Sequence, residues 1–443
     1  MQEWVLIDVL ASSLLSGELN ADHARARIFK TLGRPSLRMG RLARRFVKAF
    51  AGRTRPCHCD VVEFLRRDAG FKRAWTEHRN ELSIAQWIPE PQQMQPVAAA
   101  AGWALPAIES LGELADWLSV TVGDLEWFAD LKDLNRKGAD PKLEHYRYRI
   151  LPKRSGGVRL TESPKPCLKE MQRRILSEIL NQVPVHSAVH GFAKGRSIVS
   201  FAAPHVGKRV VLRLDLQDFF PTFPAARVQA LFRTLGYPES VADRLAGICT
   251  NAVPRRVWAN RPTDISAARW YETRTLYARP HLPQGAPTSP ALANLMAYRL
   301  DCRLSGLAKS ADAAYTRYAD DLVFSGDESF ARGAGRFAAH AAAVAMEEGF
   351  RVNHRKTRIM RQGMQQRVAG IVVNRKVSLR RKDIDLLEAI LTNCVRHGPA
   401  SQNRDRHPNF RAHLEGRVGF VEMVNQRNGQ QLRELLKAVK WDP

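Results

Sequence analysis

The chain has 443 residues, of which 44% are hydrophobic and 26% are charged, proportions typical of a globular protein with two or three domains. It carries 69 lysines and arginines against 44 aspartates and glutamates, and a net charge of +25 favours a polyanionic partner such as nucleic acid over a merely basic surface. No apolar run approaches the roughly 20 residues that span a bilayer, so we expect a cytoplasmic protein without a membrane partner.

The first 140 residues are predicted to form a mainly helical N-terminal extension. Val5–Leu15 is expected to be a buried helix, because no basic leader precedes it as in a signal peptide. Residues 25–55 hold eleven lysines and arginines and no acid, with apolar residues between them. This pattern predicts one basic amphipathic helix that contacts RNA, although a solvated helix face would show the same charges. Residues 90–96 are predicted to be a linker, and Ser110–Glu113 the capping box of a further helix.

Six cysteines are scattered along the chain without paired spacing. Cys57-His58-Cys59 brings two of them together, but a C-x-C pair lacks the C-x2-C spacing of zinc sites and has no second half nearby. We therefore favour reduced thiols over a zinc site.

From Tyr146 onward the pattern changes from helical to mixed. The predicted elements are strands at 146–150 and 158–160 around a turn at 155–157, a helix at 165–182, a strand at 209–215, a loop and helix at 284–306, a hairpin at 315–326, a helix at 330–349, short strands within 351–373, and helices after 381. This order predicts an α+β palm with flanking helical parts.

Acidic residues lie at the ends of two predicted strands. Asp215 ends the strand at 209–215, and Asp320-Asp321 occupy the turn of the hairpin. An adjacent acid pair alone is usually a solvated turn, but two neighbouring strands would bring three carboxylates together. Such a group suits two divalent cations about 4 Å apart, the arrangement that phosphoryl transfer by polymerases requires.

The residues around these acids resemble three motifs of the reverse transcriptases. Tyr318-Ala319-Asp320-Asp321 is similar to the Tyr-x-Asp-Asp box, Leu214–Phe220 to the first metal-binding motif, and Leu282–Pro290 to the template and nucleotide motif. The motifs occur in the family's order, and the likeness extends from about 148 to 382. It implies a right-hand polymerase fold, with the helical extension at 1–140, fingers and palm at 141–375, and a helical thumb that binds RNA or duplex at 376–443.

By this resemblance, each matched residue has an expected role. Asp215, Asp320 and Asp321 would be the catalytic, metal-binding acids, with the Leu216 carbonyl as a further ligand. The nucleotide-binding residues would be Lys153, Arg159, Asp218, Phe219, Phe220, Gln284, Gly285 and Lys356, and the primer grip would be Val368, Ala369 and Gly370. Phe220 would exclude a ribose 2′-hydroxyl, and Lys356 would protonate pyrophosphate. The alternatives are core packing for Phe219 and Phe220 and exposed salt bridges for Lys153 and Arg159.

Further segments resemble the retron reverse transcriptases. His190–Ile198 and Ala202–His205 are similar to segments that precede the first acid in that subfamily, and His205 would be its retron-specific residue. Phe201 and Ala369 depart from the subfamily pattern, which has asparagine and threonine there. The long N-terminal part and Ser163–Pro166 resemble the myxobacterial branch.

Membership of that subfamily implies the cofactor and the partners. The enzyme would use two Mg²⁺ ions, replaceable by Mn²⁺, and dNTPs. It would reverse transcribe its cognate noncoding RNA from the 2′-hydroxyl of an internal guanosine into branched msDNA, as part of anti-phage defence. Because the segment after the palm is too short for an RNase H domain, host RNase H would trim the template. An accessory effector or toxin protein is a further expected partner.

Three alternatives stay open at this point. A group II intron-like reverse transcriptase would need a larger thumb, and an unassociated defence reverse transcriptase would lack the His205 and Gly370 segments. A catalytically inactive RNA-binding protein could have lost one of the three acids, all of which this chain has.

Overall fold

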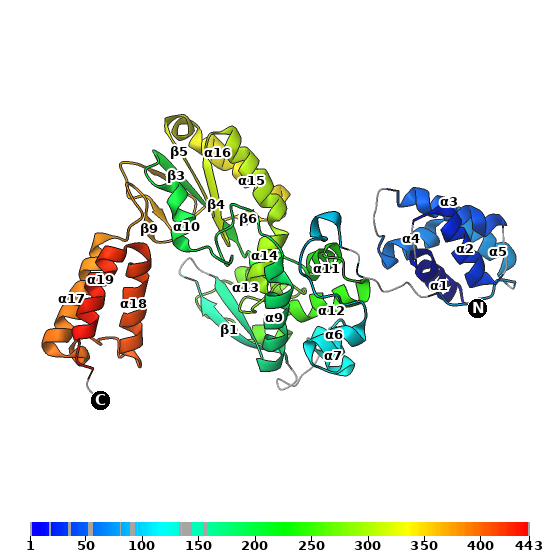
Figure 1. The fold of residues 1–443 in the computed structure, drawn as a ribbon, viewed down its shortest axis with the longest axis horizontal. Helices are drawn as coiled ribbons and strands as arrows, with labels where there is room; N and C mark the ends of the chain where they lie inside the picture. The colour runs from blue at the N-terminus through cyan, green and yellow to red at the C-terminus, as the bar shows by residue number, and fades with distance from the viewer. Residues whose placement is uncertain are drawn as a thin grey trace. The chain divides into compact units, whose positions relative to one another are not determined.

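The structure is a computed structural model (Figure 1). It describes residues 2–16, 19–33, 37–51, 56–79, 81–88, 94, 96–132, 134, 144–153 and 157–441. The predicted linker at 90–96 and turn at 155–157 fall largely outside these ranges. The chain divides into two compact units, one made of 1–102, 107–127 and 229–245, and the other of 103–106, 128–228 and 246–443. The predicted boundaries at 140 and 375 stay a prediction.

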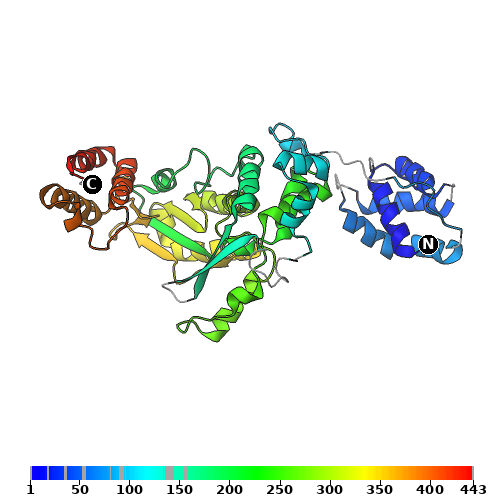
Figure 2. The same ribbon diagram turned by 90° about the horizontal axis from the view of Figure 1, so that it is seen from below.

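The first unit is helical. Its helices are α1 (Glu3–Leu15), α2 (Ala21–Leu32), α3 (Leu37–Ala49), α4 (His58–Arg67), α5 (Ala69–His78), η1 (Ala98–Ala100), α6 (Leu111–Leu118) and most of α7 (Val122–Ala129). Helices α1 to α5 surround one apolar core that includes Leu10, Phe46 and Phe71. Figure 2 shows these five helices in blue. Ser110 caps α6 as predicted, because its Oγ accepts the Glu113 N–H at 3.2 Å.

The prediction of one basic helix over residues 25–55 is wrong. The described part of this segment forms α2 and α3 as separate helices, and α2 ends at Gly33 in the left-handed region, with φ +70°. Glycine tolerates that conformation and commonly ends helices in this way. The interleaved apolar residues, such as Leu42 and Phe46, face the core of the bundle. RNA contact by the basic side chains stays a prediction.

A five-stranded sheet lies at the centre of the second unit. Its strand order is β4 (Ala314–Tyr318), β5 (Asp321–Gly326), β3 (Val210–Gln217) and β6 (Arg351–Val352), and β7 (Arg358–Arg361) also pairs with β3. Helix α16 (Glu328–Glu347) covers one face, where the rings of Phe324 and Phe337 are 5.0 Å apart. On the other face Phe201 packs against Val211 and Val323. Figure 1 shows α15 (Tyr298–Ser310) beside α16.

A two-stranded hairpin and several helices complete the part of the second unit around the sheet. Strands β1 (Tyr146–Pro152) and β2 (Val158–Pro164) pair along their whole length, and they pack against η6 (Arg255–Trp258) and α13 (Ala267–Tyr277) through a core that contains Trp258. The remaining elements are α9 (Pro166–Glu178), η3 (Leu180–Gln182), α10 (Ile198–Ala202), η4 (Ala203–His205), η5 (Phe220–Thr222), α14 (Ser289–Met296), β8 (Arg367–Val368) and β9 (Ile371–Val372). Helices α11 (Ala225–Thr234) and α12 (Glu239–Cys249) have residues in both units, most of them in the first. The predicted helix within 284–306 is in fact two helices, α14 and α15, which meet at Ala297.

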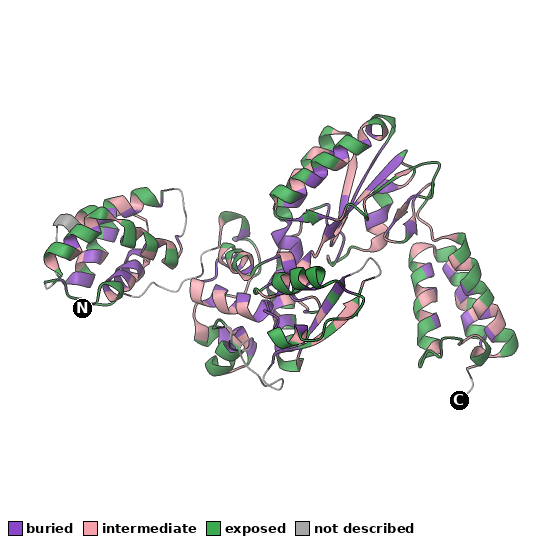
Figure 3. Ribbon diagram, turned by 180° about the vertical axis from the view of Figure 1, so that it is seen from behind, coloured by how far each residue is buried: buried purple, intermediate pink, exposed green. Residues whose placement is uncertain are grey.

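The C-terminal segment forms three helices, α17 (Arg381–His397), α18 (Phe410–Val424) and α19 (Gln426–Ala438), with η7 (Pro399–Ser401) between the first two. Their buried residues, which include Leu391, Leu414 and Leu432, form one core. Figure 3 shows the buried positions on the inner faces of this three-helix group and the exposed positions outside. Across the described residues, no helix is long and apolar enough to cross a membrane. The sheet flanked by helices confirms the predicted α+β class.

Candidate active site

The sheet pairing brings the three predicted acids to one end of β3 and β5. Asp215 on β3 lies directly opposite Asp321, the first residue of β5. Asp320 precedes it in the tight turn after β4, and its carbonyl accepts the Leu216 N–H at 2.9 Å. The turn requires Ala319 to adopt φ +53°, in the left-handed region. The backbone thus fixes Asp320 and Asp321 beside Asp215.

Two cationic side chains contact these acids. Asp215 is 4% exposed, and Lys356 Nζ lies 2.9 Å from its Oδ2. Arg213 holds the Asp321 carboxylate with contacts of 2.6, 2.8 and 2.9 Å. Burial and the charges of Asp321 and Asp215 raise the pKa of Asp320 to about 6. The acids therefore form a cluster in which negative charge is costly, and a bound divalent cation would relieve that cost.

The carboxylate oxygens of the three acids do not all converge on one point. Among the described residues, the one group of three or more ligand atoms within 4.8 Å of one another is Cys57, Cys59 and Glu239. Asp321 is turned toward Arg213 instead, so its side chain would have to rotate to share a cation with Asp215 and Asp320.

The Cys57 group is explained without a metal. Cys57 donates its S–H to Glu239 Oε1 at 3.0 Å, and the other oxygen of Glu239 accepts the His58 N–H at 3.0 Å. Burial and the hydrogen bonds with Cys59 and Glu239 raise the pKa of the Cys57 thiol. All six cysteines are free.

A buried ion pair supports the turn that carries the acids. Arg317 on β4 is fully buried, and its guanidinium bonds both carboxylate oxygens of Asp301 at 2.8 Å. The same side chain donates to the Ala319 carbonyl at 3.2 Å and to Asn294 at 3.1 Å. The sequence gives no local sign of this pair, because Asp301 lies on α15, Arg317 lies on β4, and neither residue belongs to a motif.

Of the two residues predicted in the fingers, Lys153 contacts the segment that follows Asp215, and Arg159 has no such contact within the described part of the chain. Lys153 Nζ lies 3.0 Å from Asp218 Oδ1, so the β1–β2 hairpin contacts the segment after β3. Arg159 lies exposed on β2. Phe219 is 5% exposed and packs among aromatic rings, whereas Phe220 is only half-buried. Phe219 therefore packs in the protein core, which was the alternative to a nucleotide-binding role.

The Gln284–Gly285 loop lies against β2. The Gln284 carbonyl accepts the Glu162 N–H at 2.8 Å. Gly285 has φ +133°, and a Cβ there would lie 2.8 Å from the Glu162 carbonyl oxygen. Only glycine fits such a close approach without displacement of the backbone.

His205 lies in the protein interior, and the predicted primer grip lies at the turn of the β8–β9 hairpin. His205 is fully buried, and its ring nitrogens lie 2.7 Å from the hydroxyls of Ser325 and Thr316. Burial and the charge of His190 lower the pKa of His205 to about 3, so the ring is neutral. Val368 is buried on β8, and Ala369 and Gly370 form the β8–β9 turn with φ +46° and +87°.

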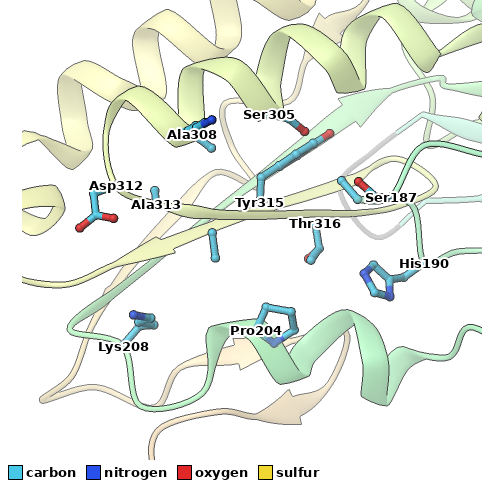
Figure 4. A pocket seen from close by; sticks show the side chains of 13 residues that line it. Ser187, His190, Pro204, Lys208, Ser305, Ala308, Asp312, Ala313, Tyr315 and Thr316 are labelled. Carbon is cyan, nitrogen blue, oxygen red and sulfur yellow. The ribbon is translucent and has the colours of Figure 1, made fainter.

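A cavity of about 560 Å³ opens beside β4 (Figure 4). It is lined by residues of the 187–190 segment, η4, α15 and β4, among them His190, Pro204, Lys208, Lys309 and Tyr315. None of the predicted metal-binding or nucleotide-binding residues lines it.

Comparison with known proteins identifies the family. Residues 151–389 match the family "Reverse transcriptase (RNA-dependent DNA polymerase)". The chain is 42% identical to the Retron Mx65 reverse transcriptase of Myxococcus xanthus over 364 residues, which cover 81% of this chain and 76% of that protein. It is 35% identical to the Retron Mx162 reverse transcriptase of the same organism, covering 82% and 73%.

Among solved structures, a foamy viral protease–reverse transcriptase in complex with double-stranded DNA matches 67% of this chain and 44% of that chain, at 14% identity and a TM-score of 0.30. A likeness that low adds nothing to the assignment, which rests on the sequence relatives. The extent of the family match and the 42% identity are decisive. The chain belongs to the retron reverse transcriptases and is an RNA-directed DNA polymerase.

Proposed function

We propose that this polymerase copies its own structured noncoding RNA into branched msDNA, starting from the 2′-hydroxyl of an internal guanosine. The observation that carries the catalytic part is the pairing of Asp215 opposite Asp321, with Asp320 in the adjoining turn. The relatives named as retron reverse transcriptases support the choice of template. A role in anti-phage defence, with an accessory effector, host RNase H and a cytoplasmic location, belongs to the same proposal.

The acid cluster suits two Mg²⁺ ions, with Mn²⁺ as a substitute. Oxygen ligands are the ones that Mg²⁺ prefers, and burial beside the carboxylates of Asp321 and Asp215 raises the pKa of Asp320. When bound, the two ions would supply activation of the attacking hydroxyl and neutralisation of phosphate charge. Asp215, Asp320, Asp321 and the Leu216 carbonyl would hold them.

The other matched residues would bind and orient the nucleotide. Lys153 and Arg159 would contact the triphosphate from the β1–β2 hairpin, and the backbone at Asp218 would lie beneath it. Lys356, already 2.9 Å from Asp215, is close enough to the acids to donate a proton to pyrophosphate. The half-buried ring of Phe220 would exclude a ribose 2′-hydroxyl.

The remaining roles concern the RNA. The thumb would bind the phosphate backbone of the RNA or of the duplex, since 375–443 holds fourteen lysines and arginines against eight acids. The turn at Val368, Ala369 and Gly370 would support the primer end. His205, buried between two hydroxyls, would act by fixing β4 and β5 and not by touching RNA.

Two experiments test the proposal at different levels. Asp321→Asn should abolish DNA synthesis while RNA binding persists, and Asp327→Asn is the matched control, because Asp327 is an exposed acid paired with Lys208. Retained primer extension by Asp321→Asn would exclude the catalytic assignment.

For the retron part, nucleic acid co-purified from the cells of origin should contain an RNA–DNA molecule that a debranching enzyme shortens. The DNA upstream of the gene should encode inverted repeats with a branching guanosine. If neither exists, the proposed template and the branched msDNA product are wrong for this retron reverse transcriptase.

A further inference from the structure

A buried glutamate joins the β1–β2 hairpin to the loop that carries Gln284 and Gly285. Glu162 on β2 is 0% exposed. Its N–H donates to the Gln284 carbonyl at 2.8 Å, and its Oε1 accepts the Gln284 N–H at a longer 3.4 Å. Together with the close approach of Gly285, these contacts mean that the position of Glu162 determines the position of the loop.

His281 supplies a positive charge next to this carboxylate. Its Nε2 lies 3.0 Å from Glu162 Oε1, and its Nδ1 lies 2.7 Å from the Arg279 carbonyl oxygen. Neither oxygen has a proton to donate while Glu162 is ionised, so both ring nitrogens donate and the ring is an imidazolium. Burial lowers the pKa of His281, but the charge and hydrogen bonds of Glu162 and the Arg279 carbonyl outweigh burial and raise it.

Neutral groups complete the surroundings of this pair. Asn251 donates its Nδ2 hydrogen to Glu162 Oε2 at 2.7 Å, and its backbone exchanges hydrogen bonds with His281 at 2.9 and 3.0 Å. Tyr148 contacts Asn251, and the ring centroids of Tyr277 and His281 lie 4.9 Å apart with the rings nearly perpendicular. Burial raises the pKa of both tyrosines, so both stay neutral at physiological pH. Glu162 and His281 are therefore the charged pair of what we call the Glu162 cluster, which also contains Asn251.

We propose that His281 is a positioning residue for the incoming nucleotide: its imidazolium holds Glu162, and Glu162 holds the Gln284–Gly285 backbone. This inference rests on the proposed nucleotide-binding role of that loop. A buried carboxylate that loses its only charged partner is strongly destabilised in place and shifts or takes up a proton. Either change alters the loop, whereas Asp215, Asp320 and Asp321 lie on other strands. Nucleotide binding should therefore suffer more than the chemical step.

The first test separates binding from chemistry. His281→Gln keeps one hydrogen-bond donor but removes the charge, and Glu162→Gln removes the opposite charge at the same size. With a generic RNA template and a DNA primer, each variant should raise the KM for dNTP about tenfold and change kcat about twofold or less, as the loss of one charge-assisted hydrogen bond predicts. Glu272→Gln is the matched control, because it breaks an exposed ion pair with Arg351 on the same unit. It should leave KM unchanged.

The second test measures the KM for dNTP as a function of pH. A purely structural role of His281 would not produce the pH dependence described here. In the unmodified enzyme the KM for dNTP should rise as pH rises through the raised pKa of His281, because the neutral ring no longer holds Glu162. In Glu162→Gln the carboxylate that the imidazolium holds is absent, so the rise in KM at that pH should be lost. In His281→Gln this rise should vanish.

The outcomes distinguish the inference from the assignment on which it rests. A rise in KM with pH that persists in Glu162→Gln, or an unchanged KM in a folded His281→Gln, overturns the role of His281. If Gln284→Ala and Gly285→Ala raise the KM for dNTP while His281→Gln does not, only this inference fails. If none of the loop variants changes KM, the nucleotide-binding assignment of the loop fails with it. Circular dichroism establishes folding, and should Glu162→Gln not fold, His281→Gln decides alone.

Discussion

Replacing Asp320 with asparagine should stabilise the protein in the absence of divalent cations. The pKa of Asp320 is raised from 3.8 to about 6 because the carboxyl is buried beside Asp321 and Asp215. A raised pKa means that the folded chain holds the proton more tightly than the unfolded chain. This group therefore favours folding at low pH, and that contribution is lost as pH rises from about 4 through about 6. At pH 7.5 the carboxylate is ionised in the folded state at a cost that asparagine avoids.

The size of the effect follows from the two pKa values. The difference between 3.8 and about 6 corresponds to about 3 kcal/mol at most. The asparagine side chain forms less favourable hydrogen bonds, which reduces the gain from removing the charge. We therefore expect a stabilisation of about 1–3 kcal/mol, which corresponds to an increase in Tm of about 2–6 °C for a unit of this size. Removal of a site that serves catalysis commonly stabilises a fold in this way.

Thermal unfolding with a chelator present measures the effect. The Tm of Asp320→Asn should exceed that of the unmodified protein at pH 7.5, and the two should converge near pH 4. Addition of Mg²⁺ should raise the Tm of the unmodified protein more than that of the variant. The exposed acid Asp327 provides the control, since Asp327→Asn should give no gain. A gain that is equal at pH 4 and pH 7.5, or no gain at all, would refute the electrostatic reasoning.

Three further outcomes test other parts of the site. Arg317→Met leaves Asp301 buried without its counter-charge and should lower the free energy of unfolding by about 3–5 kcal/mol, whereas Arg317→Met combined with Asp301→Leu should recover most of the loss in thermal unfolding. Lys356→Gln should lower kcat tenfold or more at saturating dNTP, as general-acid roles predict, and leave RNA affinity unchanged in a filter-binding assay. Phe220→Ala should increase the kcat/KM for ribonucleotides relative to deoxynucleotides in primer extension; an unchanged ratio would show that another group excludes the 2′-hydroxyl.

The palm could be predicted from the sequence because its signals are local. The β-branched run at 209–215 and the alternation at 315–326 correspond to β3 and to β4–β5. The basic segment at 25–55 was harder, because charge dominated the pattern and the end of α2 depends on the conformation of Gly33. No proline or glycine lies at the break between α14 and α15 at Ala297, so the local sequence does not predict this break.

The site was predictable where residues belong to motifs and not where they act through distant partners. Asp215 and Asp321 could be paired because the sequence places one near the end of a strand and the other at the turn of a hairpin, although β3 continues to Gln217. Glu162 and His281 are 119 positions apart, and only the fold brings them to 3.0 Å. Arg213 is an intermediate case. It lies two residues before Asp215 and thus on the same face of β3, so its closeness to the acids could have been inferred from strand alternation.

The placement of Arg213 and Lys356 bears on how the acids coexist before any cation binds. Asp215 is buried and Asp320 and Asp321 are half-buried beside it, so the three carboxylates repel one another. The backbone around them is nevertheless fixed by the β3–β5 pairing and the Arg317 contacts. Lys356 contacts Asp215 and Arg213 contacts Asp321, yet the pKa values of both Asp320 and Asp321 are raised, above all by burial. Divalent cations would therefore replace these two side chains as the counter-charges of Asp215 and Asp321, and the Asp321 side chain would have to turn away from Arg213 to take part.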